Sequence, residues 1–500
     1  MRPISSAFGG VLAASALLVG LAPGAVAQPP APGTIAWAPC PGLPTVECGT
    51  LALPIDRANP GAGTFGLAVA RRKATDPAKR VGVLVINPGG PGGSGVNFAQ
   101  RADQYFSKEI TERFDVVGFD PRGVARSNPV TCSLSVLNRQ PAPPTTAAEF
   151  DALGAYNREL TEDCRRHSGP IVDHADTGAV VDDVDALRRS LGETKISYYG
   201  VSYGTLIGQQ YAERYGRNVR ALVIDSTMDH SLDTWRFTET QAATAEDSFA
   251  EWVKWCDRDT ACALHGKDVT KVWNDLLARA DRGEITDPED ATRHVPASEI
   301  TDTAVGTFYG PDWTALADYV ATLSAQKPAA LADQAETAAY PFAAVFCQDW
   351  SIRPKSFREF STLAARARRL APHTRGSTLA TNVLTSCVGL PGDVNNPQRR
   401  PNLRDSPRIL LLNARHDPAT SYAWAVNVHR QTRAKTVFVT YEGWGHGVYT
   451  RTPCTRSTTD TYLLTTRLPT ADLTCAAPTT PVPGARAVES PTTPTFPWSS

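Results

Sequence analysis

The chain has 500 residues, a formal net charge of −1 and ten cysteines. The nearly balanced charge and the absence of any long acidic or basic block argue against nucleic acid or a charged membrane surface as a partner. A chain of this length exceeds one ordinary hydrophobic core, so we expect two domains or one large domain with an insertion. The sequence makes no prediction of the oligomeric state.

The first residues have the features of a secretory signal peptide. A single early cation, Arg2, is followed by an apolar stretch over residues 11–21 and by the small residues Ala25-Val26-Ala27. An apolar stretch this short is typical of a cleaved signal and not of a membrane span. We therefore expect residues 1–27 to be removed after Ala27, the mature protein to be secreted, and no stable insertion into a membrane.

Ten cysteines in a secreted chain are expected to form five disulfides, because the extracellular compartment is oxidising. The sequence alone does not fix their connectivity. Local spacing favours the pairs Cys40–Cys48, Cys132–Cys164, Cys256–Cys262 and Cys454–Cys475, which leaves Cys347 with Cys387. The alternative, a zinc cluster, is disfavoured because no Cys-x-x-Cys motif or paired histidine spacing occurs, so we predict no metal and no cofactor.

Four short apolar runs in the first half of the chain predict buried strands of a mostly parallel sheet. They cover residues 81–87, 114–120, 196–200 and 219–225. Between the second and third runs, residues 179–191 place apolar side chains at helical spacing with charged residues opposite, which predicts a covering helix.

The series of strand-like apolar runs ends after residue 226. Residues 229–374 are rich in Ala, Trp and acidic residues with helix-like patterning, which predicts an inserted helical cap. Strand-like runs resume at 409–413 and 436–441, with a helical segment over 422–430 between them. The core would then consist of residues 28–228 and 375–475. Residues 476–500 have almost no large apolar side chains, so we expect that tail to be disordered.

A pentapeptide, Gly200-Val201-Ser202-Tyr203-Gly204, follows one predicted strand and precedes a helix-like segment over residues 203–215. A serine hydroxyl becomes a useful nucleophile when a tight turn exposes its oxygen to a base, and small residues two before and two after allow that turn. The pattern alone also occurs by chance, but its strand-turn-helix setting favours function. We therefore predict an α/β-hydrolase fold, a mostly parallel sheet flanked by helices, with Ser202 as the nucleophile.

Two later residues complete the order nucleophile, acid, histidine that is typical of this fold. Asp417 follows the run 409–413, and His446 follows the run 436–441 inside a glycine-rich loop. We expect His446 to accept the proton of Ser202, and Asp417 to fix the histidine tautomer and stabilise the imidazolium. The alternative is that Asp417, which precedes Pro418, only forms a turn, and that His446 is a surface histidine.

The glycine-rich run over residues 87–93 directly follows a predicted strand, and its glycines let several backbone amides point into one space. We expect the amides of Gly90 and Tyr203 to form the oxyanion hole. The alternatives are a flexible turn or a phosphate loop, and the latter would need a Gly-Lys-Ser/Thr ending. Arg122, after the second strand, is expected to hold loops near the site by bonding carbonyls or a carboxylate.

These strings together resemble the secreted tripeptidyl aminopeptidases of actinobacteria, relatives of the proline iminopeptidases among the α/β-hydrolases. The most specific parts are Asn-Pro-Gly-Gly-Pro-Gly-Gly-Ser-Gly over residues 87–95, Phe-Asp-Pro-Arg-Gly from Phe119 and Tyr-Gly-Val-Ser-Tyr-Gly-Thr from Tyr199. One departure is Ala125, where the family usually has a second glycine. The resemblance implies a serine exopeptidase that releases short peptides, tripeptides among them, from the free N-termini of peptides or proteins.

An aminopeptidase of this kind needs a carboxylate that binds the substrate ammonium at a set distance from the nucleophile. The resemblance places residues 346–350 where the cap rejoins the core, and Asp349 is the candidate. Alternatively, Asp349 is an ordinary helix-end or surface carboxylate. Four tryptophans of this region either line an apolar peptide groove or belong to the core; they are Trp252, Trp255, Trp313 and Trp350.

Two other functions compete with the peptidase. A carboxylesterase or lipid-ester hydrolase would use the same Ser202, Asp417 and His446. A catalytically silent binding protein would be expected to lack one of the three, and none is lacking.

Overall fold

The computed structural model describes residues 33–288, 290, 293–325, 337–391 and 394–479. The predicted signal peptide, residues 1–27, lies outside the described residues, as does the predicted tail from residue 480 onward. Within the described ranges, no helix combines the length and the apolar character that crossing a bilayer requires.

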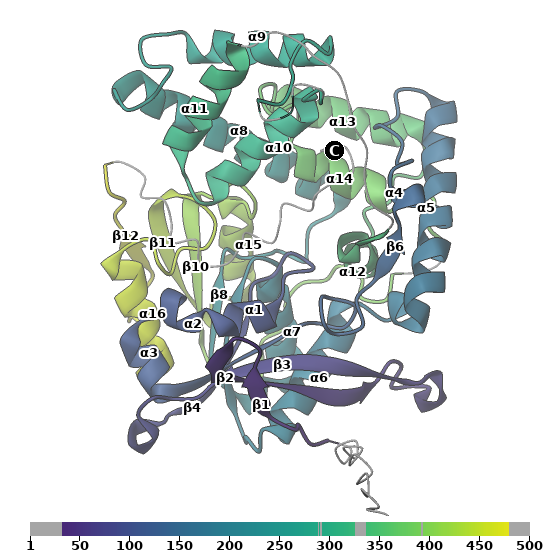
Figure 1. Cartoon of the computed structure of the whole chain (residues 1–500). Helices are drawn as coiled ribbons and strands as arrows, with labels where there is room; N and C mark the ends of the chain where they lie inside the picture. The colour runs from purple at the N-terminus through teal and green to yellow at the C-terminus, as the bar shows by residue number, and fades with distance from the viewer. Residues whose placement is uncertain (1–32, 289, 291–292, 326–336, 392–393, 480–500) are drawn as a thin grey trace, which may run out of the picture.

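A sheet of ten strands forms the centre of the described chain (Figure 1), in the order β1-β2-β3-β5-β4-β7-β8-β10-β11-β12. All pairs from β5 across to β12 are parallel, whereas β1, β2, β3 and β5 pair antiparallel. The sheet is therefore mostly parallel, as predicted. The strands are β1 (Ala38–Cys40), β2 (Leu43–Pro54), β3 (Thr64–Arg72), β4 (Gly82–Asn87), β5 (Phe114–Phe119), β7 (Ile196–Val201), β8 (Val219–Asp225), β10 (Ile409–His416), β11 (Thr436–Trp444) and β12 (Leu473–Cys475).

Strands β1 to β3 were not among the predicted elements. They form the antiparallel edge of the sheet, and β2 alternates buried side chains such as Leu51 and Leu53 with more exposed ones. An edge strand of this kind has no continuous apolar run, whereas the six predicted strands lie between covered faces and do.

Both faces of the parallel part are covered by helices, which is why its strands are mostly apolar on both faces. Val83 and Val85 of β4 pack toward helices α6, α7 and α15, and Leu84 and Ile86 pack toward α1, α2, α3 and α16. The helices on the first face are α6 (Thr177–Ser190), α7 (Tyr203–Tyr215) and α15 (Tyr422–Thr432). Those on the second are α1 (Gly95–Gln100), α2 (Ala102–Tyr105), α3 (Lys108–Arg113) and α16 (Pro453–Thr465).

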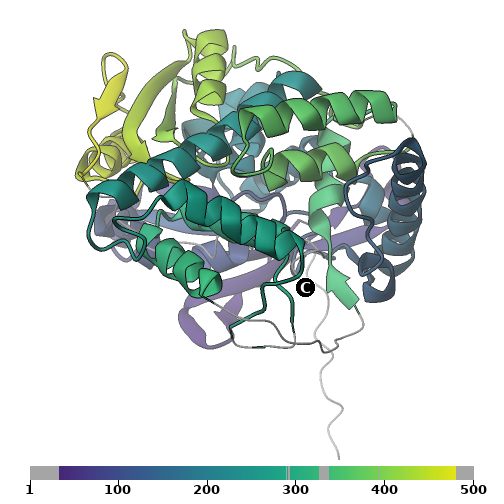
Figure 2. The same cartoon turned by 90° about the horizontal axis from the view of Figure 1, so that it is seen from above.

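Helices α8 to α14 lie between β8 and β10 in the chain, and we call them the helical insertion. They sit above the carboxyl end of the sheet in Figure 1 and cover much of the molecule from above in Figure 2. They are α8 (Thr234–Arg258), α9 (Val269–Asp281), α10 (Ala297–Tyr309), α11 (Trp313–Ser324), α12 (Pro341–Asp349), α13 (Phe357–Leu370) and α14 (Thr378–Ser386). Helices thus continue beyond residue 374; the cap boundaries at 229 and 374 stay a prediction.

A second excursion, between β5 and β7, rises beside the helical insertion (Figure 1). It contains β6 (Thr131–Ser133), α4 (Leu134–Leu137) and α5 (Ala147–Ser168). Strand β6 pairs antiparallel with β9 (Thr337–Ala339), directly before α12. This pairing ties the excursion to the helical insertion.

All five expected disulfides are present. They are Cys40–Cys48, Cys132–Cys164, Cys256–Cys262, Cys347–Cys387 and Cys454–Cys475. The fourth joins α12 to the end of α14, so it links two helices of the insertion.

Candidate active site

Ser202 occupies the sharp turn between β7 and α7. Its φ and ψ are 58° and −125°, a backbone conformation that residues other than glycine rarely adopt. A Cβ on Gly200 would overlap the carbonyl of Gly204, and a Cβ on Gly204 would overlap Asn87. The two glycines of the pentapeptide are therefore required by close backbone packing, and the turn is the strand-turn-helix elbow that the sequence predicted.

His446 lies on the loop after β11, with its side chain bonded to Asp417. Its Nδ1 lies 3.0 Å from Oδ1 and 3.1 Å from Oδ2 of Asp417. Because an ionised carboxylate only accepts, Nδ1 carries the proton and donates it. Its Nε2 is buried and has no hydrogen-bond partner among the described residues. That nitrogen is therefore the one with an unused lone pair.

Asp417 is fully buried and is held by its own turn. It accepts hydrogen bonds from the amides of Ala419 and Thr420, both at 2.9 Å, and from the Thr420 hydroxyl at 3.0 Å. Burial alone would raise the pKa of Asp417, but His446, these donors and the Ser226 hydroxyl together lower it. The carboxylate is thus kept ionised beside the histidine.

The glycine-rich loop after β4 lies against the start of α7. Gly89 and Gly90 have φ of 89° and 116°, and a Cβ on Gly89 would sit 2.7 Å from the amide nitrogen of Tyr203. The loop therefore passes close to the amide that follows Ser202. Gly90, Ser202 and Tyr203 line one cavity of about 150 Å³.

We call this cavity, which contains the predicted nucleophile, the catalytic cavity, and its wall is largely apolar and aromatic. Its other lining residues come from the helical insertion, from the turn after β8 and from the Asp417 loop; they include Met228, Phe237, Tyr309, Tyr340, Phe342, Phe346, Leu379, Val383, Thr420 and Trp424. No charged side chain is among the described residues that line it. A neutral, largely apolar group is what this cavity can best accommodate.

The four tryptophans that could have lined a peptide groove are core residues. Trp252, Trp255, Trp313 and Trp350 are all at least 96% buried, and none borders the catalytic cavity. The tryptophan that does border it is Trp424 of α15. The sequence did not predict that Trp424 borders the cavity, because the tryptophans considered for a peptide groove were those of the insertion, whereas α15 belongs to the core.

Asp349 is the last residue of α12 and is fully buried behind Tyr203. Its two oxygens accept four hydrogen bonds: from the amide of Thr177 at 2.8 Å, the Thr177 hydroxyl at 2.6 Å, the Tyr203 hydroxyl at 2.7 Å and the Asn396 amide at 2.7 Å. Burial raises its pKa to about 6, opposed by these hydrogen bonds. The sequence allowed two interpretations of Asp349, an anchor for the substrate ammonium and an ordinary helix-end or surface carboxylate. Its place at the end of α12 and its internal hydrogen bonds match a helix-end carboxylate.

A second buried carboxylate, Asp302 of α10, was not singled out by the sequence. It is 9% exposed, and its Oδ1 has no hydrogen-bond partner among the described residues. Burial raises its pKa to about 6, opposed by a hydrogen bond from Thr378, the residue before the cavity-lining Leu379. Tyr309, two helical turns further along α10, lines the cavity itself.

Arg122 supports the site as expected. Its guanidinium donates to the Asp183 carboxylate at 2.7 and 2.8 Å and to the carbonyls of Ile55 and His174 at 2.7 and 3.0 Å. It is fully buried and does not border the catalytic cavity.

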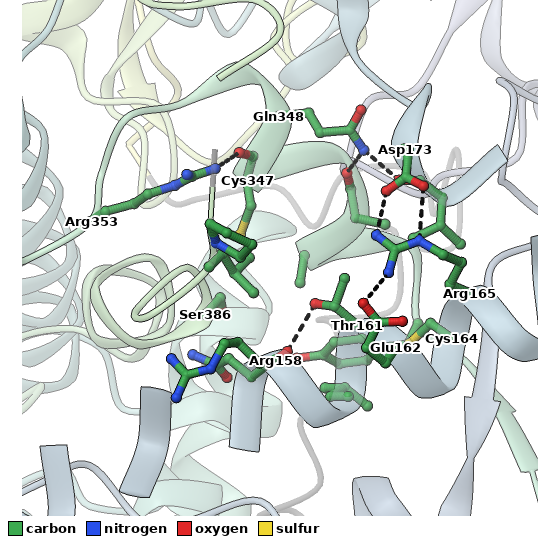
Figure 3. Close-up of a pocket in the computed structure, with 18 of the residues that line it drawn as sticks. Arg158, Thr161, Glu162, Cys164, Arg165, Asp173, Cys347, Gln348, Arg353 and Ser386 are labelled. Carbon is green, nitrogen blue, oxygen red and sulfur yellow. Dashed lines mark hydrogen bonds and ion pairs between the residues drawn. The ribbon is translucent and has the colours of Figure 1, made fainter. Parts of the chain in front are cut away.

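A larger cavity, of about 380 Å³, lies on the other side of α12 (Figure 3). Arg165 donates there to Asp173 and Glu162, and Arg353 donates to the carbonyl of Cys347. Its charged groups thus bind one another or the backbone. No serine-histidine pair is among the described residues that line it.

Three possible metal ligands, Asp247, Glu251 and His416, lie within 4.8 Å of one another. Each already has a partner: His416 Nδ1 lies 2.7 Å from Asp247, and Glu251 accepts from Lys254 and Trp444. The cluster is explained by ion pairs and a hydrogen bond that join α8 to the last residues of β10 and β11.

A parallel sheet with its serine at the elbow after β7 and a bonded aspartate and histidine after β10 and β11 defines an α/β-hydrolase. Residues 372–475 match the family model described as TAP-like protein. The chain is 30% identical over 465 residues to a tripeptidyl aminopeptidase of Streptomyces lividans, covering 88% of this chain and 85% of that protein. The chain therefore belongs to the tripeptidyl aminopeptidase family, and it is a serine hydrolase.

Two further relatives are named for different activities. A serine protease of Mycobacterium tuberculosis is 32% identical over 440 residues, covering 80% of this chain and 81% of that protein. A carboxylesterase B of the same organism is 29% identical over 460 residues, covering 86% of each. The family thus includes proteins named as peptidases and as an esterase.

Proposed function

We propose that the chain is a secreted serine exopeptidase that releases short peptides, tripeptides among them, from free N-termini. The similarity to a tripeptidyl aminopeptidase across 88% of this chain carries the proposal. The hydrogen-bonded pair of His446 and Asp417 and the elbow at Ser202 support it chemically. The five disulfides support secretion, because such bonds persist in oxidising compartments.

In the proposed mechanism, Ser202 Oγ attacks the scissile carbonyl carbon and its proton passes to His446 Nε2. Asp417 stabilises the imidazolium so formed. The amides of Gly90 and Tyr203 donate to the oxyanion. His446 then protonates the leaving amine, and the N-terminal fragment remains as an acyl-serine ester. Water, deprotonated by His446, hydrolyses this ester and restores the free serine.

The substrate ammonium would need a carboxylate oxygen that is not already satisfied. The role of Asp349 as this anchor stays a prediction, and its four internal hydrogen bonds favour a structural role. Asp302 has such an oxygen, because its Oδ1 has no partner among the described residues, but it lies behind the residues that line the cavity, beside Thr378. Seven residues along α10 separate it from Tyr309, about 10 Å, which is roughly the span of three extended residues.

A carboxylesterase is the second candidate function. The apolar wall of the catalytic cavity and the similarity to a carboxylesterase B favour it. The same triad would hydrolyse an ester, and an acyl chain would need no ammonium anchor. The two candidates therefore differ in whether a free amino group is required.

Kinetics of Ser202→Ala on a tripeptide amide, its N-acetylated form and a short-chain ester test the proposal. We expect the variant to lose all measurable turnover while melting like the wild type, and the wild type to cleave the unblocked amide but not its N-acetylated form. Full activity in Ser202→Ala would overturn the assignment of Ser202 as the nucleophile. Failure of the wild type on every amide with rapid ester hydrolysis would overturn the peptidase in favour of the esterase.

A further inference from the structure

Asp225 and Ser226 lie at the end of β8, between the strands that carry the proposed nucleophile and the proposed acid. The sheet order β7-β8-β10 puts the carboxyl end of β8 between Ser202 and Asp417. Both residues of the dipeptide are fully buried, and neither borders the catalytic cavity. Their influence on the site is therefore exerted through other residues.

The backbone of the dipeptide is bonded to both neighbouring strands. The amide of Ser202 donates to the carbonyl oxygen of Asp225 at 3.0 Å. The amide of Ser226 donates to the carbonyl oxygen of Leu412 in β10 at 2.9 Å. Ser226 has a φ of 60°, which costs about 1 kcal/mol or more for a residue with a Cβ. The bonds to both strands hold it in that conformation.

The side chains of the dipeptide hold the loop that carries His446. The Asp225 carboxylate accepts the amides of Val448 at 2.9 Å and Tyr449 at 3.0 Å. The Ser226 hydroxyl oxygen accepts the amide of Gly447 at 2.7 Å. Three consecutive amides after the histidine thus end on these two side chains.

The Asp225 carboxylate acts only as an acceptor. Besides the two amides, it accepts the Tyr199 hydroxyl at 2.7 Å, and that hydroxyl shares a hydrogen bond with Tyr105. Burial raises the pKa of Asp225, while Tyr199, the two amides and the positive charge of His446 oppose that rise. The two backbone amides can only donate, so both oxygens of the Asp225 carboxylate face the histidine loop as acceptors, the arrangement that suits an ionised carboxylate.

Other titratable groups that face the loop, among the described residues, include Asp417, Arg451, Asp460, which accepts the Tyr449 hydroxyl at 2.8 Å, and His416, whose carbonyl accepts the Gly445 amide at 3.2 Å. Asp417 bonds directly to the His446 ring. Arg451 donates to the carbonyls of Gly447 and His446, so its charge is on the backbone side of the loop. A proton on the imidazole would thus be attracted by two carboxylates, one in contact and one through the loop.

We propose that Asp225 and Ser226 are positioning residues for the triad. They hold the His446 loop at a fixed position relative to Ser202, and the Asp225 carboxylate stabilises the protonated histidine during catalysis. This rests on the proposed function of the triad. It assigns a second carboxylate to the site, on β8, in addition to Asp417.

The test is the pH profile of kcat/KM for Asp225→Asn. Removing a negative charge that favours the imidazolium moves the acidic limb to lower pH, by about half a unit or more. We expect kcat to fall about a hundredfold with little change in KM. The matched control is Asp229→Asn, a buried carboxylate bonded to Ser231 and Asn427, which should leave the limb in place.

A purely structural role would lower the melting temperature without moving the acidic limb, and that result would overturn the electrostatic part of the proposal. Ser226→Ala removes one hydroxyl and decides the positioning part even where Asp225→Asn fails to fold. We expect about a tenfold loss in kcat, because the Gly447 amide loses its acceptor and Asp417 loses the hydrogen bond from the Ser226 hydroxyl. Unchanged kcat in Ser226→Ala would overturn the positioning role.

Ser202→Ala measured in parallel separates this proposal from the triad itself. Loss of turnover in Ser202→Ala with a wild-type profile in Asp225→Asn would overturn only the role of Asp225. Retained turnover in Ser202→Ala would overturn the triad.

Discussion

The ring of Tyr309 packs on the ring of His446, with the ring centroids 4.8 Å apart. The carbonyl oxygen of Tyr309 also accepts the backbone N–H of His446 at 2.9 Å and a guanidinium N–H of Arg451 at 2.7 Å. Tyr309 is the last residue of α10, so the helical insertion touches the proposed base through both a side chain and the backbone. The orientation of the imidazole therefore depends on the insertion as well as on Asp417.

Replacing Tyr309 separates the contribution of its ring from that of its hydroxyl. In Tyr309→Ala the imidazole loses the aromatic surface that restricts it, and we expect kcat/KM to fall by about tenfold to a hundredfold. In Tyr309→Phe the ring and the carbonyl contacts remain, and activity should stay within about threefold of the wild type. Steady-state kinetics on one unblocked peptide, with melting curves for both variants, measure this. Equal losses in the two variants would contradict a packing role.

The sequence predicts the parallel sheet and the order of the triad because both depend on local signals. The run 196–200 is mostly apolar and is buried, and Gly200 and Gly204 bracket a turn that only small residues fit. His446 and Asp417 follow their own strands directly. The hydrogen bond between them was expected from chain order alone, and it forms at 3.0 Å.

Residues whose role depends on distant contacts could not be predicted in this way. Asp225 was assigned only as the end of a strand, because its partners Val448 and Tyr449 lie more than 220 positions away. Asp302 lies in a helix with no motif around it, and only its buried, unpaired oxygen sets it apart. The hydrogen bonds that satisfy Asp349 come from three separate segments, so its burial was not visible in residues 346–350.

Substrates with and without a free amino group should show whether Asp302 or Asp349 binds the substrate ammonium. In Asp302→Asn, we expect KM for an unblocked tripeptide amide to rise about tenfold or more, because a buried charge pair with the ammonium is lost. Hydrolysis of a neutral ester should change little in this variant. Asp349→Asn should not alter the preference for unblocked over acetylated peptide. A loss of that preference in Asp349→Asn alone would restore Asp349 as the anchor.

The pH dependence of stability tests the buried state of Asp349. Its pKa of about 6 exceeds the ordinary 3.8, so between these values the folded state binds more protons than the unfolded state. The free energy of unfolding of the wild type should therefore fall as the pH rises through this window, by about 3 kcal/mol from this residue. Asn at this position carries no charge and lacks that dependence.

Asp349→Asn should consequently be most destabilising near pH 4 and about 3 kcal/mol less so near pH 7. The Asn amide also faces donors, so some destabilisation should persist at every pH. Urea unfolding of the wild type and the variant at several pH values measures the difference. A constant difference would show that Asp349 does not hold its proton in the folded state.

The Cys347–Cys387 disulfide joins the two helices, α12 and α14, that form opposite parts of the cavity wall. Phe346 lines the cavity from α12, and Leu379 and Val383 line it from α14. The bond spans 40 positions in sequence, so its loss should cost about 4 kcal/mol of stability through chain entropy. In the double variant Cys347→Ala, Cys387→Ala, the walls should also loosen, and we expect KM to rise about tenfold.

Removal of the Cys454–Cys475 bond is the matched control. It spans 21 positions and ties α16 to β12 at the edge of the sheet, away from the residues that line the cavity. Its double alanine variant should lose about 3 kcal/mol but keep the KM of the wild type. Since the two variants lose similar stability, a rise in KM confined to the first would come from the cavity wall. An equal rise in both would mean that general destabilisation, and not the link between α12 and α14, sets substrate affinity.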